Sequence, residues 1–163
     1  MTEEKFTFFW GGPFSQWHPC SIEIDGVIYN CAEQYMMAQK ALLFEDNIAH
    51  KKIMFTSDPK NQKKYGRQVK NFDENIWNKF TKDIVYKANY AKFTQNEYLK
   101  KILLATVGTT LVEASLYDSP YDQIWGIGLA SDDPKAKDRN TWRGTNWLGE
   151  IITRVREDII GEK

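Results

Sequence analysis

Helical periodicity limits the folds open to this chain. Apolar side chains recur at spacings of three and four residues after Asp73, after Gln95 and after Asn146, which is the repeat of a helix with one buried face. Shorter apolar or alternating segments, typical of strands, lie between and before these runs. The pattern predicts a compact α+β domain that is rich in helix and has a small set of short strands.

The N-terminal part has clear turn and capping signals. Residues 6–9 predict a short strand, and residues 22–24 and 27–29 flank Asp25-Gly26, a strong hairpin signal. We expect a helix from an Asn30 cap through Phe44. A second helix should open at Asp58-Pro59 and end near Gly66.

The C-terminal part is expected to contain both strands and helices. Helices are predicted from Asp73 and from Gln95 or Asn96. Residues 111–114 and 124–129 read as short buried strands, and residues 131–141 as a polar surface loop. A last helix should run from about Asn146 to Ile160.

Composition narrows the class of protein. We expect one domain over residues 1–163, and 22 Lys and Arg balance 22 Asp and Glu. Zero net charge argues against a dedicated nucleic-acid or membrane-surface binder. Without a signal peptide or membrane span, the protein is expected to be cytoplasmic.

Cysteine and histidine positions favour no metal and no cofactor. Cys20 and Cys31 lack metal-ligand spacing, and His18 and His50 lie far apart in the sequence. The two cysteines are expected to be free thiols, although pairing across the N-terminal hairpin is an alternative.

An acid and an amine share one helix face in the segment Glu33–Lys40. The two residues are seven apart, so their Cα atoms lie about 10 Å apart along the axis. Together they suit proton transfer and covalent chemistry at a carbon–nitrogen bond. Glu33 has an alternative role as a capping residue at the third helical position, and Lys40 as a solvated lysine. An apolar surrounding would favour the neutral, nucleophilic amine of Lys40.

Other segments combine aromatic, glycine and basic residues. Trp125-Gly126 offers a stacking face beside a backbone that a ligand can approach closely. Arg143 precedes a helix start, and Arg67 follows Lys63 and Lys64, so both are candidate phosphate contacts. Each segment also has a purely structural explanation, as strand, helix cap or solvated surface.

The motifs in this order resemble the NADAR/YbiA-like family. The matching segments extend through nearly the whole chain: Phe9-Trp10-Gly11-Gly12, Phe14-Ser15, the block from Glu33 to Ala41, Gly66-Arg67-Gln68-Val69, Trp77, Lys92-Phe93-Thr94-Gln95-Asn96, residues 119–129, Trp142 to Gly149, and Val155-Arg156. The resemblance implies an N-glycosidase fold that handles ribosylated amines and ADP-ribose-like ligands.

The resemblance also implies a reaction. The bacterial branch cleaves the N-glycosidic bond of ribosylaminopyrimidine phosphates, early intermediates of riboflavin synthesis, and releases ribose 5-phosphate. Alternatives are an ADP-ribosyl-guanine glycohydrolase, for which nucleic acid is a partner only as modified substrate, and a non-catalytic ADP-ribose or NAD reader. The least favoured hypothesis is a structural or interaction module without catalytic activity. The oligomeric state stays open.

Carried over position by position, the resemblance predicts two groups of site residues. The catalytic group is Glu33, Lys40 and Asp122, with Asp118 as a competitor for the role of Asp122. The substrate-binding group consists of Trp10, Gly12, Arg67, Trp125, Gly126, Asn146 and Trp147. Gln34 departs from the family, which often has His at this position. The role of Lys40, as a Schiff-base nucleophile or as a charge, is open.

Overall fold

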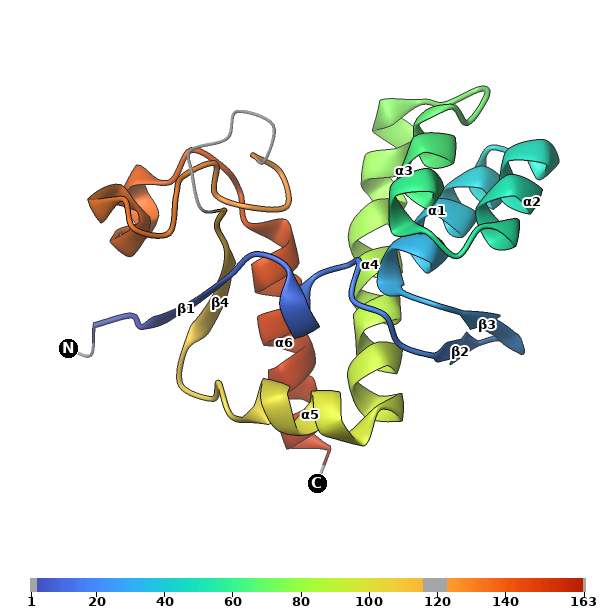
Figure 1. The fold of residues 1–163 in the computed structure, drawn as a ribbon. Helices are drawn as coiled ribbons and strands as arrows, with labels where there is room; N and C mark the ends of the chain where they lie inside the picture. The colour runs from blue at the N-terminus through green and yellow to red at the C-terminus, as the bar shows by residue number, and fades with distance from the viewer. Residues whose placement is uncertain (1–2, 116–122, 163) are drawn as a thin grey trace. The chain divides into compact units, whose positions relative to one another are not determined.

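The computed structural model describes residues 3–115 and 123–162 and divides into two compact units, residues 16–97 and residues 1–15 with 98–163. The described residues contain six α-helices and four short strands (Figure 1). In chain order these are β1 (Phe6–Phe9), β2 (Ile22–Ile24), β3 (Val27–Tyr29), α1 (Ala32–Leu43), α2 (Asn47–Phe55), α3 (Pro59–Arg67), α4 (Glu74–Gln95), α5 (Glu97–Leu104), β4 (Thr110–Glu113) and α6 (Trp147–Gly161). The predicted helix-rich α+β class is confirmed. No helix in the described ranges has the length and apolar character needed to cross a membrane.

Helix α1 is the centre of the unit formed by residues 16–97. It packs against α2, α3 and α4, and the β2–β3 hairpin precedes it (Figure 1). Because neighbours surround its first two turns, every residue from Cys31 to Ala38 is buried. Polar residues on these turns are therefore removed from water.

Aspartate side chains start three helices of this unit. Asp58 and Asp73 accept hydrogen bonds from the first backbone N–H groups of α3 and α4, as predicted. Asp46 does the same for α2, accepting from the Ala49 N–H at 3.0 Å. Helix α2 is not evident from the sequence, because Ile48 and Phe55 are apolar yet exposed and obscure its buried stripe of Ala49 and Ile53.

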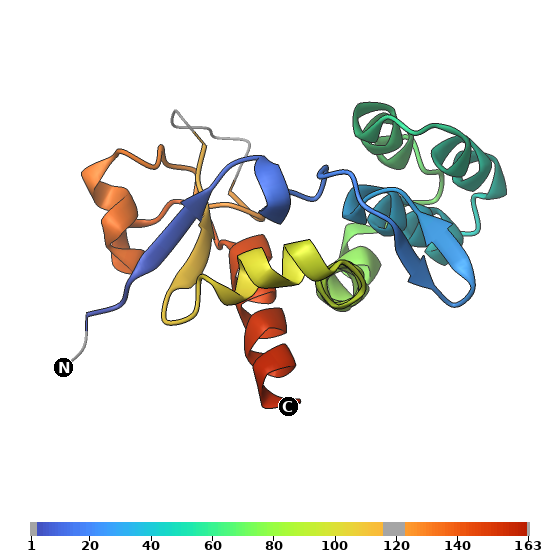
Figure 2. The same cartoon turned by 60° about the horizontal axis from the view of Figure 1, so that its bottom comes forward.

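The second unit is built on a parallel strand pair. Strands β1 and β4 align from Phe6 opposite Thr110 to Phe9 opposite Glu113, and α6 packs against β4 (Figure 2). The polar segment 131–141 is a surface segment, as predicted, with two short 3-10 turns. Helix α6 starts at Trp147, after Asn146 in a left-handed conformation with φ 53°.

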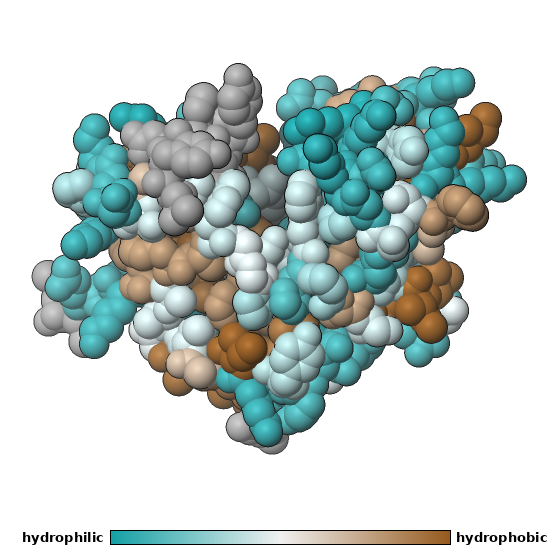
Figure 3. Space-filling view, in the orientation of Figure 1, coloured by the Kyte–Doolittle hydropathy of each residue, from teal (hydrophilic) through white to brown (hydrophobic). Residues whose placement is uncertain are grey.

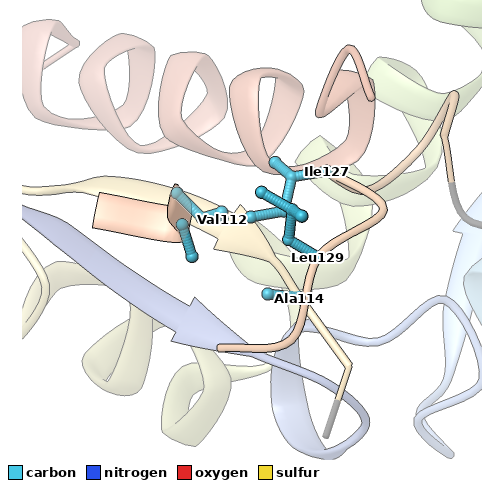
Figure 4. Close-up of a cluster of buried hydrophobic side chains, with 5 residues drawn as sticks. Val112, Ala114, Ile127 and Leu129 are labelled. Carbon is cyan, nitrogen blue, oxygen red and sulfur yellow. The ribbon is translucent and has the colours of Figure 1, made fainter. Parts of the chain in front are cut away.

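Residues 124–129 form no strand, so that prediction is wrong. The backbone of Ile127 bonds irregularly: its N–H donates to Glu113 O at 3.0 Å, and its carbonyl accepts from Arg143 N–H at 3.0 Å. The segment is apolar because it is buried. Ile127 and Leu129 pack in a cluster with Val112 and Ala114 (Figure 4).

Candidate functional site

The N-terminus of α1 differs from its predicted form. The helix begins one residue later than expected, and Cys31, without a side-chain hydrogen bond to the helix, is its N-cap in place of Asn30. Gln34 Oε1 accepts instead from the Asn30 N–H at 2.8 Å, and Gln34 Nε2 donates to the Ile53 carbonyl at 3.2 Å. Through these two hydrogen bonds, Gln34 connects the first turn of α1 to the residue before the helix and to α2.

Glu33 does not cap the helix. It is the second helical residue, its N–H donates to the Gln16 carbonyl at 2.9 Å, and its carboxylate accepts no hydrogen bond from the described residues. The capping alternative for Glu33 is therefore wrong. A carboxylate held at 6% exposure without a cap hydrogen bond needs another explanation.

Electrostatics around Glu33 suit an acid. Burial raises the pKa of Glu33 to about 7, although Lys63, Lys40 and Arg67 each pull this pKa down. A carboxyl group with this pKa is partly protonated at neutral pH and can both donate and accept a proton. Two of the three cations come from α3, so the α1–α3 packing creates this environment.

Lys40 lies further along α1 against two aromatic rings. Its Nζ is 4.4 Å from the ring centroid of Phe72 and 5.7 Å from that of Trp77. Burial lowers the pKa of Lys40, Glu33 raises it and Arg67 lowers it. The Lys40 side chain is partly exposed, so its amine is only partly removed from water.

Arg67 is the last residue of α3 and is exposed. Its charge acts on both Glu33 and Lys40, so the structure brings these three predicted residues together in one unit. Residue patterns did not reveal Phe72 and Trp77 as neighbours of Lys40. Their contacts with Lys40 bridge more than thirty residues, for which local periodicity carries no signal.

Four predicted binding residues meet in the other unit. Trp125 and Trp147 pack edge to face with centroids 5.6 Å apart, and the Asn146 N–H donates to the Gly126 carbonyl at 2.9 Å. The Asn146 amide also spans two backbone groups of β4, accepting from Glu113 N–H and donating to the Leu111 carbonyl, both at 3.0 Å. This group shapes the start of α6, and ligand contact by it stays a prediction.

The remaining predicted residues contribute less to the described geometry. Trp10 is half exposed after β1, and Gly12, with φ 70°, opens a short 3-10 turn. Asp122 and its competitor Asp118 lie outside the described residues.

Neither cysteine chemistry nor a metal centre is evident in the described part of the chain. Cys20 and Cys31 are free thiols, and burial raises the pKa of Cys31 to about 12. No group of three His, Cys, Asp or Glu side chains there is arranged around a common metal position. A cavity of about 310 Å³ touches Cys20, Tyr29 and Phe55 but none of the predicted site residues, and we assign it no chemistry.

A buried carboxyl group with a pKa near neutrality, such as that of Glu33, can donate and accept protons, as acid–base catalysis of bond cleavage requires, and the charge of Lys40 acts on it. Comparison with known proteins places this chain in a family. The family model of the NADAR domain matches residues 8–160, so the chain belongs to the NADAR family. The match includes residues of both units, and we propose that residues 1–163 form a single domain.

Relatives in other organisms bear names that describe activity. An N-glycosidase of Acanthamoeba polyphaga mimivirus is 43% identical over 97% of this chain and 98% of its own. N-glycosidase YbiA of Escherichia coli is 30% identical over 93% and 84% of the two chains. More distant is the chloroplastic riboflavin biosynthesis protein PYRR of Zea mays, at 29% identity over 92% of this chain but 24% of its own.

The fold comparison agrees with the sequence comparison. The NMR structure of Escherichia coli YbiA superposes with a TM-score of 0.77 at 27% identity, covering 99% of this chain and 89% of the other. The predicted family, fold and enzyme class, a hydrolase acting on N-glycosyl bonds, are thereby confirmed.

Proposed function

We propose that this enzyme hydrolyses the N-glycosidic bond of ribosylaminopyrimidine phosphates of early riboflavin synthesis and releases ribose 5-phosphate. The single observation that carries the reaction type is the buried Glu33 carboxyl, whose pKa of about 7 suits a general acid at neutral pH. The substrate class is supported by the cations Lys63, Lys40 and Arg67 around this acid, which suit a phosphate group. The relative named for riboflavin biosynthesis supports the choice of base.

Protonation of the ring oxygen by Glu33 would break the ring C–O bond and leave an iminium at the anomeric carbon, to which water or the Lys40 amine adds before the substrate amine leaves. Alternatively, Glu33 would donate its proton to the leaving nitrogen. The bond between nitrogen and the anomeric carbon then breaks, and its electron pair stays with nitrogen. Water adds to the oxocarbenium-like carbon and gives up a proton to a carboxylate, for which we propose Asp122. Lys40 either binds an anionic group of the substrate or attacks the opened sugar to form a Schiff base. Borohydride added during turnover distinguishes these roles, because it reduces a Schiff base to a stable adduct and leaves a bound anion unchanged.

The test follows free ribose 5-phosphate by chromatography with mass detection, above the spontaneous rate. We expect release by the wild-type enzyme and a loss of about 100-fold or more in Glu33→Gln and Lys40→Ala. Lys87→Ala is the matched control, because Lys87 is an exposed lysine that pairs with Asp25 at 3.6 Å. No release by the wild-type enzyme would refute this substrate.

A second candidate, hydrolysis of ADP-ribosylated guanine in nucleic acid, is favoured by the distribution of charge. Residues 47–70 contain seven Lys and Arg but one Asp, although the whole chain is neutral. All seven are exposed, and we refer to them together as the basic face: Lys51, Lys52, Lys60, Lys63, Lys64, Arg67 and Lys70. None of them forms an ion pair with a described carboxylate.

The basic face includes part of the site itself, because Lys63 and Arg67 act on Glu33. Hydrophilic residues cover much of α3 in Figure 3. A phosphate backbone lying there would present a modified base near the acid. Release of ADP-ribose from a modified oligonucleotide, without release of ribose 5-phosphate from the metabolite, would favour this candidate.

A further inference from the structure

The surroundings of the Lys40 ammonium carry a further inference. Lysines that are fully buried are usually paired, whereas Lys40 is partly buried and no described carboxylate lies within ion-pair distance of it. Two aromatic rings occupy its surroundings instead: Phe72 at 4.4 Å and Trp77 at 5.7 Å from Nζ. Both distances lie within the roughly 6 Å range of a cation–π interaction.

Residues other than Lys40 fix the positions of the two rings. Phe72 packs edge to face on Phe44, at the end of α1, with centroids 5.4 Å apart. Phe72 lies in the connection between α3 and α4. A hydrogen bond from the Lys70 N–H to the Asp46 carboxylate, at 2.9 Å, fixes this connection to the start of α2. Trp77, in the first turn of α4, is 8% exposed.

The rings of Phe72 and Trp77, here called the aromatic clamp, affect the Lys40 amine differently from a carboxylate partner. Ring faces stabilise the ammonium form of an amine but carry no net charge, so the positive charge remains available to an anionic group. They therefore oppose the effect of burial, which favours the neutral amine. The charged groups that face Lys40 are Glu33 on α1 and Arg67 on α3, and the nearby part of α4 offers the Trp77 ring.

We propose that Phe72 and Trp77 are positioning residues that hold Lys40 in place as a cation, so that Lys40 binds an anionic group of the substrate and does not act as a Schiff-base nucleophile. The inference rests on the proposed function for the identity of the substrate. The state of the amine is independent of that identity and is measurable without turnover.

The experiment measures the pKa of Lys40 by NMR titration of 13Cε-labelled lysine, with Lys40→Arg to assign the signal. In Phe72→Leu we expect this pKa to fall by about half a unit to one unit, and in Phe72→Tyr we expect it to stay near the wild-type value. Phe80→Leu is the control, since Phe80 is an aromatic residue of similar exposure on α4, 46% against 43% for Phe72. An unchanged Lys40 pKa in folded Phe72→Leu overturns the clamp.

Kinetics then test the role of the charge. In Phe72→Leu we expect KM for the phosphorylated substrate to rise several-fold above neutral pH, with a smaller rise at lower pH, and Phe72→Tyr to restore it. A Lys40 adduct trapped by borohydride overturns the proposal. If the wild-type enzyme releases no ribose 5-phosphate, the proposed substrate fails, while the titration still decides the clamp.

Discussion

Glu33 shows how one residue links stability to chemistry. Burial leaves its carboxyl group with a pKa of about 7, against 4.5 for an exposed glutamate. Between these two pH values the folded protein binds a proton that the unfolded chain has released. Stability contributed by this group is therefore present at low pH and lost as pH rises from 4.5 to 7.

Glu33→Gln removes this dependence. A neutral amide of the same shape does not ionise, so we expect the variant to be more stable than wild type by up to about 3 kcal/mol at pH 8 and nearly equal at pH 4.5. Urea unfolding at the two pH values measures the difference. Equal stability of the two proteins at pH 8 would contradict the raised pKa, whatever happens to activity.

Lys92 is a second buried ionisable residue, outside the proposed site. Its side chain on α4 is 0% exposed, and burial lowers its pKa to about 8. Between pH 8 and the pKa of 10.5 of an exposed lysine, the unfolded chain holds a proton that the folded protein has lost. Stability therefore rises with pH across this window, and below pH 8 the protein carries the full cost of the buried charge.

We expect Lys92→Met to raise the free energy of unfolding at pH 7 by up to about 3 kcal/mol, a gain that shrinks between pH 8 and 10.5. Thermal or urea unfolding across this pH range measures it. Lys87→Met, at an exposed position of the same helix, should change little. A gain of similar size at pH 7 and pH 10 would rule out titration of Lys92 as its cause.

At the scale of elements, the contact between α1 and α3 sets the charge around Glu33. Gly66 makes this contact possible, because a Cβ there would overlap the Sδ of Met37 on α1. Helix α3 also carries Lys63 and Arg67. Because Gly66 has no side chain, α3 can pack closely on α1, and these two cations then act on Glu33.

Gly66→Ala is expected to destabilise the protein by about 1–3 kcal/mol, even though alanine is the better helix former. Denaturant unfolding gives the value, and kcat/KM is expected to fall with it. The double variant Met37→Ala with Gly66→Ala supplies the control. If removing the Met37 side chain recovers none of the loss in a double-mutant cycle, overlap with Met37 is not the cause.

At the scale of the whole molecule, charge is neutral in sum but uneven in distribution. The basic face lies within residues 47–70, and carboxylates elsewhere in the chain balance it. Net charge therefore understates the attraction that this face exerts on a polyanion at short range, within a Debye length of about 10 Å at 0.1 M salt.

We expect weak, salt-dependent binding of single-stranded DNA, measured by fluorescence anisotropy, and its loss in Lys60→Glu with Lys64→Glu. The control is Lys135→Glu with Lys137→Glu, which makes the same change of net charge at exposed positions outside the basic face. Equal loss in both double variants would mean that total charge, and not the basic face, governs the binding.

Local patterns predicted local structure well. Asp25-Gly26 marked the β2–β3 hairpin, Asp58 and Asp73 marked helix starts, and repeated apolar residues marked α4 and α6. The wrong strand prediction for residues 124–129 has a tertiary cause. Residues 124–129 are apolar because they are buried, but their backbone bonds to distant segments in place of a strand ladder, which no local pattern encodes.

For the site, the sequence by itself determined that Glu33 and Lys40 share a helix and that the chain resembles an N-glycosidase family, because helical spacing and motif order are properties of the chain. Only the tertiary structure decided what these residues are chemically. The pKa of Glu33 depends on burial and on cations from α3, and the Lys40 ammonium meets rings from α4 and the connection before it. Such contacts join residues far apart in sequence, so they exist only once the helices have packed.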